Sequence, residues 1–138
     1  MRKLGIAVIL FIGFSVPNII DAGVARRQFC EDDYQNVFLA ARQAVHNVGA
    51  KIIHSDSNGG SIVGRIEADD YGHVMEISVW INRERDSRPG AAAPVWVQIQ
   101  ARFKKVKDPD PEQLEQLEII EDHVFGLIRE RAACGPPQ

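Results

Sequence analysis

The fold is decided by the stretch HVMEISVWINRE, residues 73–84, and by VWVQIQARFKKV, residues 95–106. Apolar and polar residues alternate in both, which is the period of a β-strand that buries one face. Trp80 and Trp96 fall on the polar side of this alternation. The two stretches predict adjacent antiparallel strands whose apolar side needs a covering layer. That apolar side consists of Met75, Ile77, Val79, Ile81, Val95, Val97, Ile99, Ala101 and Phe103.

Two shorter strands are expected upstream, at residues 51–55 and 61–68. The segment DSNGG, residues 56–60, separates them, and Asp, Asn and Gly suit the tight turn of a hairpin. A second turn is expected at residues 69–72. Because strands joined by hairpins pair antiparallel, the sequence predicts a four-stranded antiparallel sheet.

One amphipathic helix is predicted on each side of these strands along the chain. From residue 32 to residue 48 apolar residues recur at the helical period, and Gly49 is a stop signal. The segment DPEQ, residues 110–113, combines an N-cap acid, a first-turn proline and a Gln that completes a capping box, and this helix should end near Ala133. Both helices must bury an apolar stripe. We therefore expect an α+β two-layer sandwich with both helices on one face of the sheet, in the order α-β-β-β-β-α.

Residues 1–25 have the features of a secretory signal peptide. Two basic residues precede an apolar run, and the segment GVA, residues 23–25, is a small-x-small cleavage pattern. Cleavage is expected after Ala25, with Ala22 as the second position. An uncleaved anchor is the alternative, although the run is short for a span of roughly 20 apolar residues. We expect a single domain over residues 26–138, secreted or periplasmic, with no stable membrane span after cleavage.

The charge of the chain argues against a nucleic-acid partner. The net charge is −3, and loss of Arg2, Lys3 and Asp21 with the leader changes it to about −4. No basic stripe is visible in the sequence. The last four residues, 135–138, are expected to fray.

The two cysteines, Cys30 and Cys134, are predicted to form a disulfide. Lipid attachment at Cys30 is rejected because the residues before it are not those of a lipoprotein signal. Four strands between two helices make the helices antiparallel, so the cysteines flanking the helical layer lie at the same end. Three strands would separate them and favour an intermolecular bond or free thiols. An exported chain with two cysteines favours the intramolecular pair.

No catalytic, cofactor or metal site is predicted. His54 and His73 come near Asp56 and Asp70 in sequence, but no metal-binding His spacing is present. The segment EDH, residues 121–123, is interpreted as solvated helix surface, because consecutive helical residues face different directions. Motifs of nucleotide-binding and serine-hydrolase sites are also absent from the sequence. We expect a protein that is not an enzyme.

The candidate binding residues are Trp80, Trp96, Gln98 and Arg102, all on the polar side of the last two strands. If the hairpin closes symmetrically, residues whose numbers sum to about 176 oppose each other, which would place Trp80 across from Trp96. Such a pair could simply stabilise the sheet, by roughly 0.2–1 kcal/mol. Two tryptophans on a polar face are also typical of a contact surface. A second candidate is the loop of residues 83–94, with Arg83, Arg85 and Arg88.

The stretch DDYQNVFLAARQAVHNVGAKIIHSDSNGGSIVGRIEA, residues 32–68, resembles small bacterial cell-envelope domains of unknown function, which are often lipoproteins. It is also similar to the helix-on-sheet domains of accessory lipoproteins in outer-membrane barrel assembly. The resemblance extends over residues 32–106, and the chain departs from those families in lacking a lipobox cysteine. It implies an envelope location without catalysis, and it supplies no functional residues.

The sequence therefore supports an exported, non-enzymatic protein that binds an envelope protein, or a second copy of itself, through the open face of its sheet. The first alternative is a domain that holds a small molecule or lipid between helices and sheet, which would require an empty pocket in the core. The second alternative is an enzyme such as a hydrolase, which would require convergent polar groups in a cleft.

Overall fold

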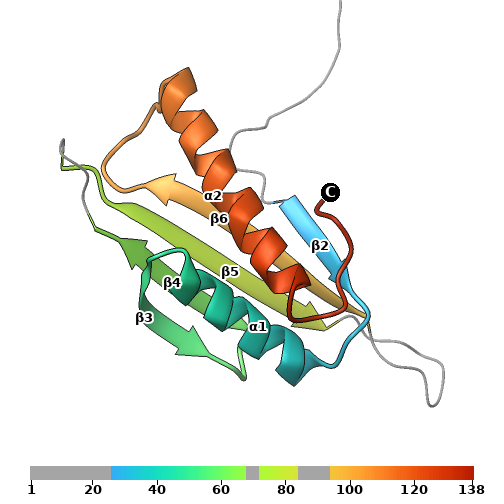
Figure 1. Cartoon of the computed structure of the whole chain (residues 1–138). Helices are drawn as coiled ribbons and strands as arrows, with labels where there is room; N and C mark the ends of the chain where they lie inside the picture. The colour runs from blue at the N-terminus through green and yellow to red at the C-terminus, as the bar shows by residue number, and fades with distance from the viewer. Residues whose placement is uncertain (1–25, 68–71, 84–93) are drawn as a thin grey trace, which may run out of the picture.

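The computed structural model describes residues 26–67, 72–83 and 94–138, which form one antiparallel sheet and two helices (Figure 1). The five strands lie in the order β2-β6-β5-β4-β3. The α+β class and the antiparallel sheet predicted from the sequence are thus confirmed. The elements along the chain are β2 (Arg26–Cys30), α1 (Tyr34–Asn47), β3 (Lys51–Asp56), β4 (Ser61–Ile66), β5 (Met75–Arg83), β6 (Val95–Phe103) and α2 (Pro111–Arg129).

The prediction of four strands in the order α-β-β-β-β-α is wrong, because β2 precedes α1 and forms a fifth strand beside β6. In this pairing Phe29 lies opposite Trp96 and Cys30 opposite Val95. The segment RRQFC has no readable apolar alternation, since its buried positions are Gln28 and Cys30. Hydrophobic periodicity cannot predict a strand whose buried residues are a glutamine and a cysteine.

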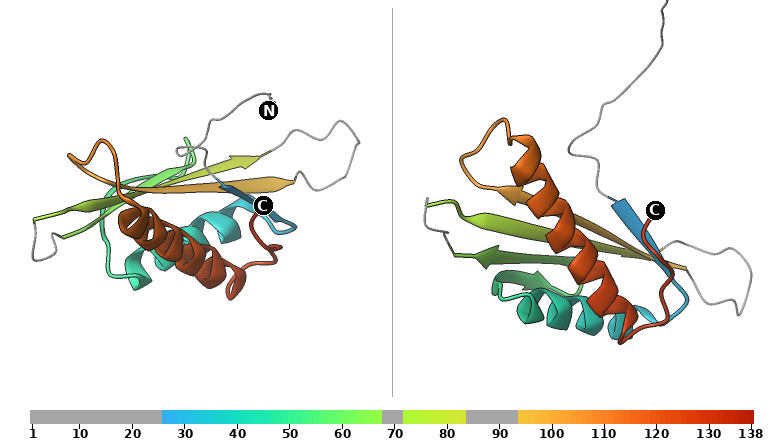
Figure 2. Two further views of the ribbon diagram at one scale, coloured as in Figure 1. Left: turned by 90° about the horizontal axis from the view of Figure 1, so that it is seen from above. Right: turned by 45° about the horizontal axis from the view of Figure 1, so that its top comes forward.

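Both helices lie on the same side of the sheet in the edge-on view of Figure 2. Helix α1 packs over β3, β4 and β5, while α2 packs over β6 and against α1. The alternating apolar residues of β5 and β6 point into this layer and are buried, as are Val37, Phe125 and Ile128 from the helices. No described helix covers the opposite face of the sheet. The side chains on that face therefore form a surface of the described part of the molecule.

Local sequence signals account for both helix starts. Asp33 is the N-cap of α1, and its side chain accepts a hydrogen bond from the backbone N–H of Asn36. The capping box predicted for α2 is confirmed. The side chain of Asp110 accepts from the backbone N–H of Gln113, and the side chain of Gln113 accepts from that of Asp110. Pro111 is the first residue of the helix. Within the described residues neither helix is long and apolar enough to cross a membrane. The leader predicted at residues 1–25 lies outside the described part of the chain.

The C-terminal segment runs along the free side of β2 instead of fraying as predicted. Backbone N–H and C=O groups of Arg27 and Gln138 bond to each other in both directions, at 3.2 and 2.8 Å. The N–H of Gly135 bonds to the carbonyl of Phe29 at 2.9 Å, and that of Glu31 to the carbonyl of Ala133 at 2.7 Å. The segment satisfies backbone groups that an edge strand would otherwise present to solvent.

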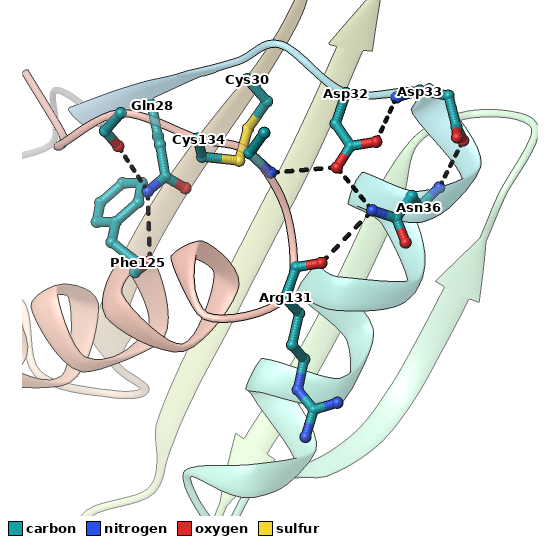
Figure 3. The surroundings of a disulfide bond; sticks show 10 residues. Gln28, Cys30, Asp32, Asp33, Asn36, Phe125, Arg131 and Cys134 are labelled. Atoms are coloured by element: carbon teal, nitrogen blue, oxygen red, sulfur yellow. Dashed lines mark hydrogen bonds between the residues drawn. A yellow bond between two sulfur atoms is a disulfide. The ribbon is translucent and has the colours of Figure 1, made fainter.

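The predicted disulfide between Cys30 and Cys134 is present, with Cα atoms 3.9 Å apart (Figure 3). It joins the end of β2 to the segment after α2, which is the shared end of the helical layer that the strand count predicts. Asp32 accepts a hydrogen bond from the N–H of Ala133 at 3.1 Å and another from the side chain of Asn36 at 2.7 Å. These hydrogen bonds lower the pKa of the Asp32 carboxyl.

Buried Gln28 reinforces the same junction. Its side-chain amide donates to the carbonyls of Phe125 at 3.3 Å and of Gly135 at 3.0 Å, so one side chain joins β2, α2 and the C-terminal segment (Figure 3). The amide oxygen of Gln28 is buried and has no hydrogen-bond partner among the described residues. The two donated bonds explain why a polar residue occupies a core position.

Candidate interaction surface

The face of the sheet opposite the helices brings all four predicted binding residues together. Trp80 comes from β5, while Trp96, Gln98 and Arg102 come from β6, and each alternates with buried neighbours. We call this side of the sheet the outer face. Its other members are Arg27 and Phe29 of β2, Lys51, His54 and Asp56 of β3, Ser61, Val63 and Arg65 of β4, Glu76, Ser78 and Asn82 of β5, and Gln100 of β6, as the burial pattern and strand register require.

The predicted register between the tryptophans is wrong by two residues. Trp80 lies opposite Gln98, and Trp96 lies opposite Asn82, so the two rings are diagonal neighbours. Period-two alternation fixes which face a residue occupies, but it leaves open where the hairpin closes. The loop length alone could not decide between registers that preserve the same face.

Trp96 is packed by two residues of β2, Arg27 and Phe29, which hydrophobic alternation does not identify. The ring of Phe29 meets it edge-on with centroids 5.1 Å apart, and the guanidinium of Arg27 lies 4.5 Å from the centroid of the Trp96 ring. Both contacts have the geometry of favourable aromatic and cation–π interactions. Only an explicit assignment of RRQFC as a strand would have found Arg27 and Phe29.

Trp80 is the more open of the two tryptophans. Its neighbours across the sheet are Gln98 on β6 and Ser61 on β4, both of which are small or polar. The side chain is 38% exposed, which is high for a large apolar residue in the middle of a sheet. Trp80 therefore presents apolar area that the described part of the chain does not cover.

A row of basic residues surrounds a single acid further along the outer face. Glu76 pairs with Arg102 at 3.0 Å and is 4.0 Å from the ammonium of Lys104. Arg65 lies directly opposite Glu76 on the next strand, and Lys51 lies opposite Arg65. Arg102 is 64% exposed in its side chain, while Glu76 is 12% exposed, so the acid is covered and the base faces solvent.

Acidic residues are concentrated elsewhere, on the solvent side of α2. Its exposed carboxylates are Glu112, Glu115, Glu118 and Asp122. The chain as a whole is negative, at −3, while the outer face has more bases than acids. The bases are Arg27, Lys51, Arg65 and Arg102, and the acids are Asp56 and Glu76. Charge is therefore segregated between the two sides of the molecule.

Glu121 is an exception to the predicted solvated surface of residues 121–123, because its side chain is only 16% exposed. It accepts a hydrogen bond from the backbone N–H of Ala101 at 2.8 Å and pairs with Arg26 at 3.3 Å. Arg26 also bonds Asp122 at 2.6 Å. Glu121 thus joins α2 to β6 and to Arg26 of β2. Its partial burial could not be predicted from the sequence, because the position of β2 was not predicted.

The pKa values of both members of this ion pair are raised, for different reasons. Burial raises the pKa of Glu121 and outweighs the hydrogen bond from Ala101 and the charge of Arg26, which lower it. Burial lowers the pKa of Arg26, but its bonds to Asp122 and Glu121 outweigh that effect and leave it raised. Attraction alone would lower the carboxyl pKa, so loss of hydration dominates at Glu121.

A groove of about 630 Å³ lies on the solvent side of α1. Most of its lining residues are exposed, and Leu39 is 58% exposed. The groove is therefore external and is not the empty core pocket that the ligand-binding alternative requires. Its lining residues are Asn36, Leu39, Ala40, Arg42, Gln43, His46, Ile52 and Arg131.

The remaining candidates form no cluster. His54 lies 3.0 Å from the hydroxyl of Ser61, and His73 packs beside the ring of Phe103. No group of three His, Cys, Asp or Glu residues could hold a metal among the described residues, and Asp70 lies outside them. In the second candidate region, the guanidinium of Arg83 lies 4.6 Å from the centroid of the Tyr34 ring, while Arg85 and Arg88 lie outside the described residues.

No family model matches the sequence, and no curated protein shows significant sequence similarity to it.

Proposed function

We propose that the protein is an exported, non-enzymatic domain of the cell envelope that binds a protein partner through the outer face of its sheet. The observation that carries this proposal is Trp80, a large apolar side chain that is 38% exposed on the face without helices. Tryptophan is enriched among the residues that dominate binding energy at interfaces. Trp96, held by Phe29 and Arg27, would provide a rigid border to the contact.

Export is supported by the disulfide and by the features of residues 1–25. The bond between Cys30 and Cys134 is typical of a chain that matures in an oxidising compartment. The mass of the intact protein from its native cells, with and without reduction, tests this part of the proposal. We expect a chain beginning near residue 26, with no thiol available until reduction. A retained leader and two reactive thiols would contradict export and oxidation together.

Site-specific crosslinking tests the surface. A photo-crosslinking phenylalanine analogue replaces Trp80 in one variant and Leu39 in the control. Leu39 is 58% exposed but lies on α1, on the other side of the sheet. We expect a discrete protein adduct from position 80 in native cells and none from position 39. The surface assignment is wrong if position 80 gives no adduct or if both positions give the same one.

A substitution then measures the contribution of the ring. Trp80→Ala should weaken capture of the crosslinked partner by about tenfold or more, which is the scale of an interface hot spot. The variant should still fold, because Trp80 is 38% exposed and lies outside the core between the helices and the sheet. Leu39→Ala is the matched control and should capture the partner normally. A Trp80→Ala variant that unfolds instead would show that the ring is structural.

A further inference from the structure

We propose that the outer face recognises an acidic segment of its partner that also carries apolar side chains. This inference rests on the proposed function and adds the chemistry of the partner. It is drawn from the position of positive charge beside the exposed aromatic area. The relevant residues are Arg27, Trp80, Trp96, Arg102 and Lys104.

Cations flank the aromatic area at two places. The first is Arg27, which lies opposite Gln98 and therefore in the same row across the sheet as Trp80. The second is the group around Glu76, where Arg102 is 64% exposed and Lys104 is 37% exposed. Two carboxylates lie in this group, Glu76 against Arg102 and exposed Glu67 beside Lys104. With Arg65 counted, the group has three bases and two acids and keeps net positive charge for a ligand.

The spacing of these features sets the length of the segment. Gln98 marks the row of Trp80 and lies four residues from Arg102 on β6, which corresponds to about 13 Å along a strand. A partner that reaches both places must span at least that distance, in about four extended residues or about nine helical residues. The chemistry required is an apolar side chain against Trp80 and a carboxylate beside Arg102 and Lys104.

A short acidic segment fits this surface better than an extended polyanion. The whole chain has a net charge of −3, and its exposed acids on α2 repel a large negative body at a distance. A peptide bound at the sheet experiences mainly the nearby bases, because salt screens charges beyond about 8 to 10 Å. The segregation of charge therefore favours a local contact with an acidic protein segment over DNA or an anionic membrane.

The test uses the purified, oxidised protein and three labelled peptides of about twelve residues, long enough to span both places in either conformation. The first contains Glu, Leu and Phe, the second replaces Glu by Lys, and the third replaces Leu and Phe by Ser. Fluorescence anisotropy measures their binding at about 50 and about 300 mM NaCl. We expect the first peptide to bind about tenfold more tightly than either control, and to weaken with salt.

Paired variants locate the binding. Arg102→Gln with Lys104→Gln removes the two charges next to Glu76, and Arg42→Gln with Arg129→Gln removes two exposed charges from the helices. Only the first pair should weaken the acidic peptide, by about tenfold, and reduce its salt dependence. Thermal unfolding of both pairs establishes that they are folded. Equal effects of the two pairs would overturn the inference.

Two further outcomes would also overturn it. One is equal binding of the acidic and basic peptides, and the other is tighter binding of duplex DNA or phosphatidylglycerol vesicles than of the acidic peptide. These results concern only the chemistry of the partner. If crosslinking from position 80 succeeds while acidic peptides fail, the surface stands and its proposed ligand class is wrong. If that crosslinking fails, the surface itself is wrong.

Discussion

At the scale of single residues, Glu121 shows how burial competes with pairing. Its carboxylate has both a strand amide and the guanidinium of Arg26 within reach, yet its pKa is raised because loss of hydration is the larger effect. The folded state then holds the proton more tightly than the unfolded chain does. Folding is favoured most below the ordinary carboxyl pKa, and this contribution is lost as the pH rises through the raised value.

Glu121→Gln should remove that pH dependence. Glutamine has an oxygen that can accept from Ala101 but no proton to release in this range. The free energy of unfolding of the variant, minus that of the wild type, should therefore increase as the pH rises from the ordinary carboxyl pKa through the raised one. Urea unfolding across the acidic to neutral range measures this difference. A constant difference would mean that Glu121 titrates alike in the folded and unfolded chains.

The outer face shows which properties of single residues the sequence could provide. Alternation placed Trp80, Trp96, Gln98 and Arg102 on one side of the sheet, because a strand has a strict period of two. Alternation could not give the register of the hairpin. The structure places the two tryptophans diagonally, whereas a symmetric hairpin would place them opposite each other. The contacts of Trp96 with Arg27 and Phe29 depend on a strand that had not been recognised.

At the scale of elements, prediction succeeded where one local signal was sufficient. The caps of α2 and the alternation of β5 and β6 are encoded by residues close in sequence. The strand β2 and the C-terminal segment are stabilised by each other instead, through backbone bonds between residues about a hundred positions apart. Neither has a hydrophobic pattern of its own, so neither could be predicted separately.

The contact between α1 and β4 depends on Gly64. A β-carbon at this position would lie 2.5 Å from a methyl of Val45 and 3.0 Å from the β-carbon of Ala50. Gly64→Ala should therefore force α1 away from the sheet and lower the free energy of unfolding by roughly 1–3 kcal/mol. Gly126→Ala is a control, because a β-carbon there meets nothing within 4 Å. Thermal and urea unfolding compare both variants with the wild type. If Gly64→Ala were as stable as the wild type, close packing of α1 against Gly64 would be excluded.

At the scale of the whole molecule, β2 and the C-terminal segment close the fold around the cysteine pair. The disulfide, the Asp32–Ala133 hydrogen bond and the two bonds from Gln28 all lie at this junction (Figure 3). The junction supports the outer face, because β2 carries Arg27 and Phe29 against Trp96. Stability of the closure and integrity of the proposed surface are therefore linked.

Replacing both cysteines by serine should demonstrate this link. The bond joins residues 104 positions apart, and the chain-entropy model assigns such a closure about 4–5 kcal/mol. We expect the Cys30→Ser, Cys134→Ser variant to lose about that much stability in urea unfolding. Hydrogen exchange should accelerate in β2 and residues 134–138 before it does in β4 and β5, because the latter keep both strand neighbours. Uniform acceleration across the sheet would show that the bond stabilises the molecule globally, with no local effect on the edge that supports Trp96.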